Sequence, residues 1–219
     1  DAPLLHPDLR TKYKGDVEHV ASNIAEHQEF IRGDAEEALK NAHVVVERTF
    51  DTGTVHQGYI EPDSEAAWVR HDGSVTVWAN TQGTHLQRRE LAHVLSIPIK
   101  MINVIPTEVG GAFGGKESVR VVALCAALSR KTRFPVRLSL GREEIIRAGW
   151  PSTSIKCSMK VGADEQGNIV GVESWIAFNS GAYPGAPIQS AVRRVFSHYR
   201  VENMKVDAFD VITNRPPNS

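Results

Sequence analysis

Four glycines within six positions form the stretch of this sequence best suited to chemistry: Gly110, Gly111, Gly114 and Gly115. A strand is expected before this loop and a helix after it. Consecutive backbone N–H groups would then face an incoming ligand beside the positive end of the helix dipole. The loop therefore predicts a site for an anion or a phosphate group.

Two well-known phosphate-binding motifs do not fit this loop. The spacing from Gly110 to Lys116 matches a P-loop, but Glu117 stands where Ser or Thr should coordinate magnesium. The dinucleotide pattern G-x-G-x-x-G is absent, because Gly111 is followed by Ala112 and another non-glycine residue. A second interpretation stays open: the glycines form a turn that lets a helix pack closely against a sheet.

The elements around the loop indicate an α+β fold, with mixed sheets, hairpins and packed helices. Asp34 is expected to cap a short helix with Glu37 at its third position, and Asp72-Gly73 predicts a hairpin turn. Residues 16–30 show only a weak helical pattern. The predicted strands cover residues 43–50, 65–70, 74–79, 102–109, 134–140, 154–161, 169–178 and 205–213, and the main helices cover 81–97, 117–130 and 142–147.

Composition restricts the class of protein. The chain has 219 residues, of which 41% are hydrophobic, and a formal net charge of -1. We therefore expect a folded core and no electrostatic bias towards nucleic acid or anionic membranes. Cys125 and Cys157 lie far apart and form no C-x-x-C, so they cannot ligate an iron–sulfur cluster or build a structural zinc site. A reduced, cytoplasmic location is the expectation.

Three segments gain meaning when they are taken together: His56-Gln57-Gly58-Tyr59-Ile60-Glu61-Pro62, Thr81-Gln82-Gly83 and the loop 110–117. In this order and spacing they resemble the large subunit of molybdenum hydroxylases, the xanthine dehydrogenase and aldehyde oxidase family. The resemblance runs from about Arg32 to the C-terminus. It implies a molybdopterin-binding domain of the xanthine dehydrogenase type. Residues 33–219 would be the first molybdenum-cofactor-binding domain, and residues 1–32 a lead-in from a preceding domain.

The resemblance implies that several residues bind the cofactor. Gln82, followed by Gly83, matches a glutamine whose side-chain N–H can hydrogen-bond an oxo ligand on molybdenum without ligating the metal itself. Its alternative is a plain helix-entry residue. Gly111, Ala112 and Gly114 would bring the backbone close to the pterin. Many family members have a further glycine at the position of Ala112, so its methyl group requires a negative φ there.

Other residues near the loop are assigned by the same resemblance. Phe113 matches a phenylalanine whose neighbouring backbone contacts the metal centre and whose ring helps to wall the substrate pocket. Glu117 matches the carboxylate that orients the substrate in purine-oxidising members, and its alternative is a first-turn glutamate favoured by the helix dipole. Lys116 is expected to make a structural or phosphate-side contact, while His56 and Glu61 are interpreted as scaffold.

The resemblance also implies an activity and its cofactors. The enzyme would be an oxidoreductase that hydroxylates aldehydes, purines or other N-heterocycles with water as the oxygen source. Its molybdenum cofactor would be molybdopterin, either plain or as the cytosine dinucleotide, with [2Fe–2S] and FAD groups on other subunits or domains. The partners would be the rest of the large subunit, those iron–sulfur and flavin subunits and a small-molecule substrate, with no nucleic acid and no membrane.

Two features of the family are expected downstream of this sequence. An Arg-Gly-Phe-Gly segment normally follows a stretch like Thr213-Asn214-Arg215-Pro216-Pro217, and the general-base glutamate lies near the subunit's C-terminus. We therefore expect a fragment, truncated at its C-terminus, that holds no catalytic residue and does not turn over alone. Two alternatives remain: a non-catalytic module with a vestigial cofactor loop, and an unrelated nucleotide-binding module.

Overall fold

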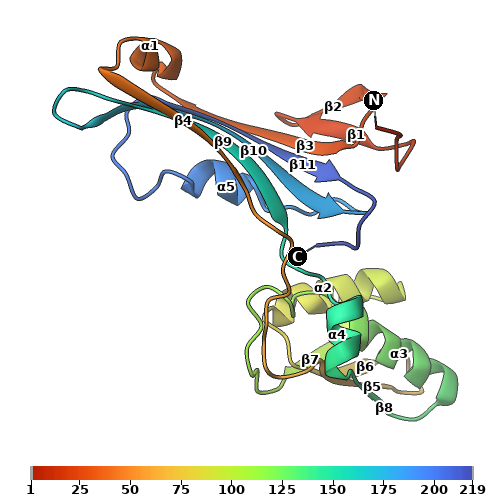
Figure 1. The fold of residues 1–219 in the computed structure, drawn as a ribbon. Coiled ribbons are helices and arrows are strands. Elements are labelled where there is room, and N and C mark those ends of the chain that lie inside the picture. Colours follow the sequence, from red (N-terminus) through yellow and green to blue (C-terminus); the bar gives the residue numbers. More distant parts are fainter. Residues whose placement is uncertain (1, 219) are drawn as a thin grey trace. The chain divides into compact units, whose positions relative to one another are not determined.

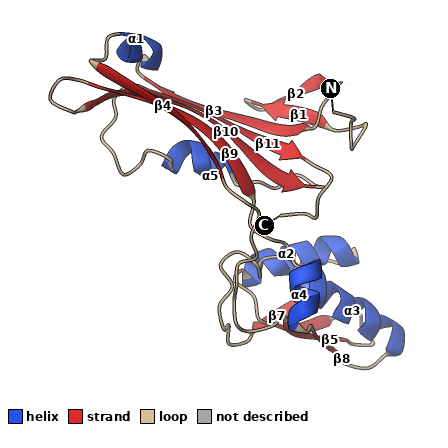
Figure 2. Cartoon of the chain, viewed as in Figure 1, coloured by secondary structure: helices blue, strands red, loops and turns tan. Residues whose placement is uncertain are grey.

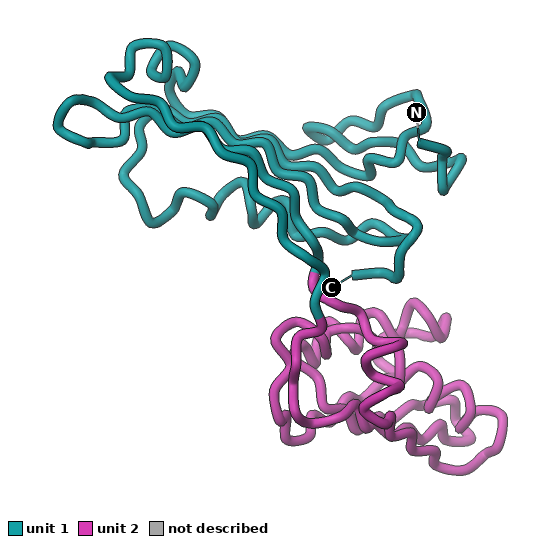
Figure 3. The backbone as a smooth tube through the Cα atoms, viewed as in Figure 1, with its two compact units in different colours: residues 1–55, 153–219 teal, residues 56–152 magenta. Residues whose placement is uncertain are grey.

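The structure, a computed structural model, describes residues 2–218 and divides the chain into two compact units (Figure 3). Unit 2 is the continuous segment of residues 56–152, and unit 1 is formed by the residues before and after it. Each unit has its own sheet and its own helices (Figures 1 and 2). None of the helices in the described part of the chain has the length and apolar character needed to cross a membrane.

Unit 1 is built on a seven-stranded sheet with the order β2-β1-β3-β11-β10-β9-β4. The short helices α1 (Ala35–Lys40) and α5 (Ile188–Arg194) pack against it. The core between the sheet and α5 includes Val172, Val206 and Ile188. The strands are β1 (Arg10–Tyr13), β2 (Asp16–Ala21), β3 (Ile24–Arg32), β4 (Val44–Asp51), β9 (Ser154–Ala163), β10 (Ile169–Gly181) and β11 (Met204–Ile212).

The first thirty residues differ from the sequence-based expectation. The weak helical pattern over residues 16–30 is wrong, because these residues form β2 and most of β3. Strand β3 pairs with β11 from Arg32 opposite Met204 to Ile24 opposite Val211. A partner so distant in the sequence leaves no local signal. The proposed domain boundary at residue 33 stays a prediction.

The predicted cap of α1 is confirmed. The Asp34 side chain accepts a hydrogen bond from the Glu37 N–H at 3.0 Å. This contact satisfies one of the N–H groups that the first turn of a helix leaves without a partner.

Unit 2 has a four-stranded sheet with the order β7-β6-β5-β8. The predicted hairpin at Asp72-Gly73 joins β5 and β6 as an antiparallel pair, and β7 lies at the edge, where its Pro106 needs no partner for a missing N–H. The strands are β5 (Ser64–Val69), β6 (Val75–Ala79), β7 (Ile102–Pro106) and β8 (Val136–Ser139). The helices are α2 (Thr84–Leu95), the 3-10 turn η1 (Ile99–Met101), α3 (Arg120–Thr132) and α4 (Arg142–Ala148).

This topology brings the three segments singled out from the sequence to one edge of the sheet. Strands β6 and β7 are parallel, so the segments that follow them, residues 80–83 and 107–119, leave the sheet at the same edge. Strand β5 is antiparallel to β6, so residues 56–63 enter at that edge too. The carboxyl ends of parallel strands are a common place for a binding site.

Candidate functional site

The glycine loop has a tight, partly strained backbone. The Gly115 N–H donates to the Ala112 carbonyl at 2.9 Å, and the two residues between them, Phe113 and Gly114, have φ values of +51° and +95°. Two positive φ angles in the centre are the mark of a type I′ turn, and they are costly for a residue with a side chain. Phe113 therefore stands in a strained conformation at the tip of the turn with 74% of its surface exposed. The negative φ required of Ala112 is present.

Most of the glycines are needed for packing against the segment before β5. A Cβ atom added at Gly110 would lie 2.6 Å from Glu61 Cβ, and one at Gly115 would lie 2.6 Å from the Tyr59 ring. Tyr59 is buried, and it lies against Gly111 as well. Only Gly114 of the four glycines would present a Cβ to open space. The packing interpretation thus accounts for three glycines and leaves Gly114 facing outward.

Gln82 binds the loop at Gly114, the glycine that faces open space, and we call this side the outer side of the loop. Its Oε1 atom accepts hydrogen bonds from the N–H groups of Gly114 at 2.9 Å and Lys116 at 3.4 Å. The Gln82 N–H in turn donates to the Lys116 carbonyl at 3.2 Å. Because Oε1 is used in this way, the side-chain amide has one orientation, and its NH₂ group donates no hydrogen bond among the described residues.

Gly83 plays a different part at the same junction. It is the N-cap of α2, and its carbonyl accepts from the Gln87 N–H at 2.8 Å. Its own N–H donates to Thr81 Oγ1 at 3.2 Å. In this structure Gly83 starts the helix that follows Gln82.

Lys116 points away from the outer face of the loop. Its Nζ atom lies 2.6 Å from Glu61 Oε2, and the Lys116 side chain is only 2% exposed. It also lies 4.9 Å from the centre of the Tyr59 ring, a cation–π contact. The structural interpretation of Lys116 is therefore the one that the geometry supports. A lysine held in this way cannot reach a phosphate group on the outer face, which removes the P-loop likeness.

The position of Glu117 corrects one expectation. The helix was predicted to begin at residue 117, but α3 begins at Arg120. Glu117 is therefore no first-turn glutamate, and the helix dipole does not explain it. The Glu117 side chain is exposed. Burial raises the pKa of Glu90, and the nearby charge of Glu117 raises it further, whereas Arg89 lowers it.

The contacts that a row of polar residues makes behind the loop were not recognised from the sequence. Tyr59, Glu61, Asp63 and Glu65 alternate along the segment that enters β5, and the first two contact the loop. Asp63 pairs with Arg120, Oδ2 to Nη2 at 2.7 Å, just where α3 begins. The signal was the spacing of two, and burial follows it: Tyr59, Asp63 and Glu65 are buried and Glu61 is half-buried, whereas Ile60 and Pro62 are exposed.

Glu65 is the most perturbed carboxyl group of this row. It is buried, and Gln87 Nε2 donates to its Oε1 atom at 3.3 Å. Burial raises the pKa of Glu65 to about 7, with a further rise from Asp63, while the Gln87 hydrogen bond opposes the shift.

The loop leaves donors free for a polar guest. The N–H groups of Gly111, Ala112 and Phe113 donate no hydrogen bond among the described residues. Ala112 is buried, and a buried N–H without a partner is rare in a folded protein. Together with the Gln82 NH₂ group, these donors fit the phosphate and carbonyl oxygens of a molybdopterin. Among the described residues, no group of three or more His, Cys, Asp or Glu side chains could hold a metal ion.

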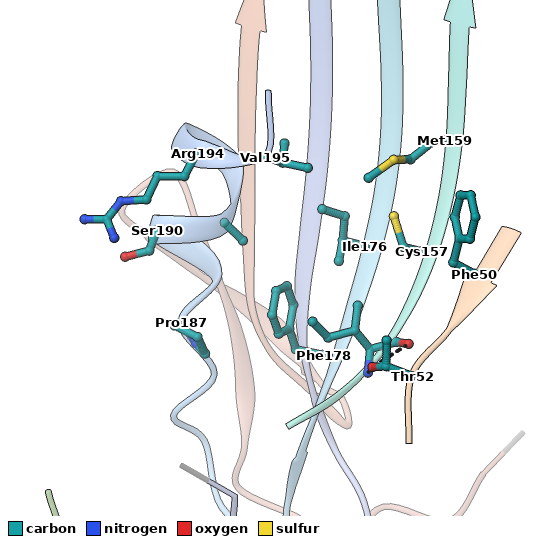
Figure 4. A pocket seen from close by; sticks show the side chains of 12 residues that line it. Phe50, Thr52, Cys157, Met159, Ile176, Phe178, Pro187, Ser190, Arg194 and Val195 are labelled. Carbon is teal, nitrogen blue, oxygen red and sulfur yellow. Dashed lines mark hydrogen bonds between the residues drawn. The ribbon is translucent and has the colours of Figure 1, made fainter. Parts of the chain in front are cut away.

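Unit 1 contains a hollow of a different kind (Figure 4). A groove of about 490 Å³ lies between α5 and the strands β4, β9 and β10. Its walls are apolar side chains such as Phe50, Met159 and Ile176, with Arg194 at the helix side. It contains none of the cofactor-site or substrate-site residues selected from the sequence.

Comparison with known proteins agrees with this geometry. A family model described as the molybdopterin cofactor-binding domain matches residues 17–219. A probable xanthine dehydrogenase subunit of Bacillus subtilis is 30% identical over 90% of this chain and 27% of its own length. The nicotinate dehydrogenase large molybdopterin subunit of Eubacterium barkeri is 31% identical over 99% of this chain and 48% of its own length. The chain thus spans between about a quarter and a half of these curated relatives.

Solved structures show the same fold. The aldehyde oxidoreductase from Desulfovibrio gigas superimposes with a TM-score of 0.80 at 22% identity, covering 92% of this chain and 23% of the other. The quinoline 2-oxidoreductase from Pseudomonas putida 86 gives a TM-score of 0.78 at 23% identity, covering 94% of this chain and 28% of the other. The predicted α+β class with mixed sheets is confirmed. The chain belongs to the molybdopterin cofactor-binding domains of the xanthine dehydrogenase and aldehyde oxidase family.

Proposed function

We propose that this chain supplies part of the cofactor and substrate site of an oxidoreductase that hydroxylates aldehydes, purines or other N-heterocycles with water as the oxygen source. When bound, the molybdenum cofactor supplies the two-electron oxidation of a substrate carbon. The names of the relatives support both substrate classes: a xanthine and a nicotinate dehydrogenase point to N-heterocycles, and an aldehyde oxidoreductase molybdenum-binding subunit of Escherichia coli, 33% identical, points to aldehydes.

The orientation of Gln82 is the observation that carries this proposal. Two backbone N–H groups of the loop hold its Oε1 atom, so the NH₂ group of this exposed side chain is available as a donor among the described residues. We infer that Gln82 donates a hydrogen bond to an oxygen of the bound cofactor. The unpaired N–H groups of residues 111–113 would hold further oxygens of the same molecule, and Gly114 would let it approach closely.

Phe113 and Glu117 are proposed to contact the substrate. Both are exposed, and both lie within four residues of Gly114. The Phe113 ring would present an apolar face to a planar heterocycle, and the Glu117 carboxylate would accept hydrogen bonds from its N–H groups.

The variant Gln82→Glu tests the role of Gln82 with almost no change in shape. A carboxylate still accepts both loop N–H groups, but it has no N–H to donate. We expect molybdenum and pterin content per chain to fall about tenfold or more under a limiting cofactor supply, as for one lost hydrogen bond to a charged partner. The control is Gln166→Glu, an exposed turn residue of unit 1, which should keep the wild-type content. Equal contents in both variants would contradict the role.

Two other functions make different predictions. A non-catalytic module with a vestigial loop would contain no molybdenum in the native protein, whereas the proposed enzyme contains it. A nucleotide-binding module would bind ATP with magnesium, which we do not expect because Lys116 is buried against Glu61. Metal analysis and equilibrium binding of ATP distinguish the three.

The remaining parts of the proposal concern the whole protein. We propose [2Fe–2S] and FAD groups on other subunits or domains, molybdopterin in its plain or cytosine dinucleotide form, and a cytoplasmic location. The catalytic glutamate would lie in chain beyond these residues, so the 219 residues alone would not turn over. Hydroxylase activity of the purified 219-residue chain would contradict this last point.

A further inference from the structure

One carboxylate joins the two ends of the glycine loop. Glu61 Oε2 accepts a hydrogen bond from the Gly110 N–H at 2.7 Å and another from Lys116 Nζ at 2.6 Å. The Glu61 N–H also donates to the Gly110 carbonyl at 3.2 Å. Glu61 thus contacts the first residue of the loop twice and the residue after its last glycine once.

These bonds involve charges that water screens poorly. The Lys116 side chain is 2% exposed and that of Glu61 is 32% exposed. Burial opposes ionisation of Glu61, but the Lys116 ammonium and the Gly110 N–H together hold the pKa of this carboxyl below its ordinary value. If Glu61 moved away from Lys116, a buried ammonium would lose its partner, which is strongly destabilising. The ion pair therefore keeps the two ends of the loop in place.

The loop needs such an anchor because its own sequence gives it little rigidity. Glycines leave the backbone free to adopt many conformations, and Phe113 occupies a φ of +51° that its own preference disfavours. Gln82 bonds the outer side of the loop at Gly114 and Lys116. On the inner side, Thr81 Oγ1 donates to the Lys116 carbonyl, and Glu61 bonds both Gly110 and the Lys116 ammonium.

We propose that Glu61 is a positioning residue for the cofactor: by tying Gly110 to Lys116 it keeps the loop in the shape that presents Gly114 and the free N–H groups to the pterin. This inference rests on the proposed function. Within the segment of residues 56–62, which the sequence alone indicates to be scaffold, Glu61 would then have the specific task of pre-ordering a binding loop. A loop ordered in advance loses less entropy when the ligand binds.

Hydrogen exchange of the native protein tests the first half of the inference without any reference to activity. In Glu61→Gln the amide oxygen can still accept the Gly110 N–H, but Lys116 loses its counter-charge. We expect the hydrogen-bonded amides of the loop, those of Gly110, Gly114, Gly115 and Lys116, to exchange at least tenfold faster. The amides of β6, which report the stability of the whole unit, should accelerate by a clearly smaller factor. The control Glu143→Gln breaks an exposed ion pair of the same unit, with Arg147, and should change neither set.

The double variant Glu61→Gln/Lys116→Met separates positioning from plain stability. Removing both charges leaves no unpaired ammonium, so the free energy of unfolding should return towards the wild-type value. The hydrogen-bonded loop amides should still exchange fast, and molybdenum and pterin content should stay at least tenfold below wild type, because residue 61 no longer joins Lys116 to Gly110.

The outcomes are distinct. If the double variant recovers cofactor content together with stability, or if exchange in Glu61→Gln rises equally throughout unit 2, Glu61 acts on the fold alone and the inference is wrong. If the loop amides of Glu61→Gln exchange at the wild-type rate, it is wrong as well. A wild-type protein without molybdenum would instead overturn the proposed function, and the exchange rates would still decide whether Glu61 holds the loop.

Discussion

At the scale of single residues, Gly114 differs from the other loop glycines in what surrounds it. A methyl group there would meet no atom within 4 Å, but φ is +95°, so Gly114→Ala carries backbone strain without a clash. We expect it to lower the free energy of unfolding by about 1 kcal/mol. The methyl group would also occupy the space proposed for the cofactor, so molybdenum content should fall.

A glycine of the same unit provides the control. Gly73, in the β5–β6 hairpin, has a φ of +83° and equally open surroundings. Gly73→Ala should therefore cost a similar free energy of unfolding and leave molybdenum content unchanged. Chemical unfolding and metal analysis of the two variants decide, and equal molybdenum losses would count against Gly114 as a contact.

Glu65 gives stability a pH dependence of unusual sign. Its folded-state pKa is about 7, above the ordinary value of 4.5, so from about pH 4.5 to 7 the unfolded chain releases this proton while the folded chain retains it. Wild-type stability should fall across that window and level off above it. Glu65→Gln keeps an acceptor for Gln87 and has no proton to lose. The free energy of unfolding of Glu65→Gln, taken relative to that of wild type, should therefore rise by up to about 3 kcal/mol between pH 4 and pH 8. A gain independent of pH would contradict the shift.

At the scale of the elements, patterns of local origin were predictable and pairings of distant origin were not. Asp34 caps α1 and Asp72-Gly73 turns the hairpin, because a cap or a turn is decided by a few neighbouring residues. Strand β3 was missed because its polar sequence becomes a strand only beside β11, where His27 stacks on Phe209 with ring centres 4.3 Å apart. Side-chain packing of this kind outweighs propensity in a sheet.

The candidate site shows the same division. Gln82 and the loop were found through a resemblance of motifs, and the structure brings them together. Glu61 and Tyr59 were in a recognised motif, but their contacts with the loop depend on β5 lying antiparallel beside β6. The residues of the site could thus be selected from the sequence, but their contacts with the loop could be identified only from the order of the strands in the sheet.

Two helices of unit 2 end on a residue whose conformation favours glycine. Ser96 after α2 and Arg133 after α3 have φ values of +53° and +67°. Both are exposed, so a glycine would lose little contact there. We expect Ser96→Gly and Arg133→Gly each to stabilise unit 2 by about 0.5–1 kcal/mol, and their effects to add. Urea unfolding measures this, and a loss of stability in both would show that these side chains hold the helix ends.

At the scale of the whole molecule, the chain forms two hydrophobic cores. Val77 is fully buried in the core of unit 2 and Val206 in that of unit 1. Unit 2 is one uninterrupted segment inserted between the two parts of unit 1, so each core is built entirely from its own unit. Separate cores predict separate cooperative transitions, since cooperativity comes from packing within one core.

We therefore expect urea to unfold the chain in two steps, and one core substitution to move only one of them. Val77→Ala and Val206→Ala remove equal volumes from equally buried sites, each at a cost of about 2 kcal/mol to its own unit. Exchange of the hydrogen-bonded loop amides, those of Gly110, Gly114, Gly115 and Lys116, should follow the step that Val77→Ala shifts and should not change in Val206→Ala. If both variants shift a single common transition, the two cores fold as one. The loop would then owe its order to the whole chain rather than to the segment that surrounds it.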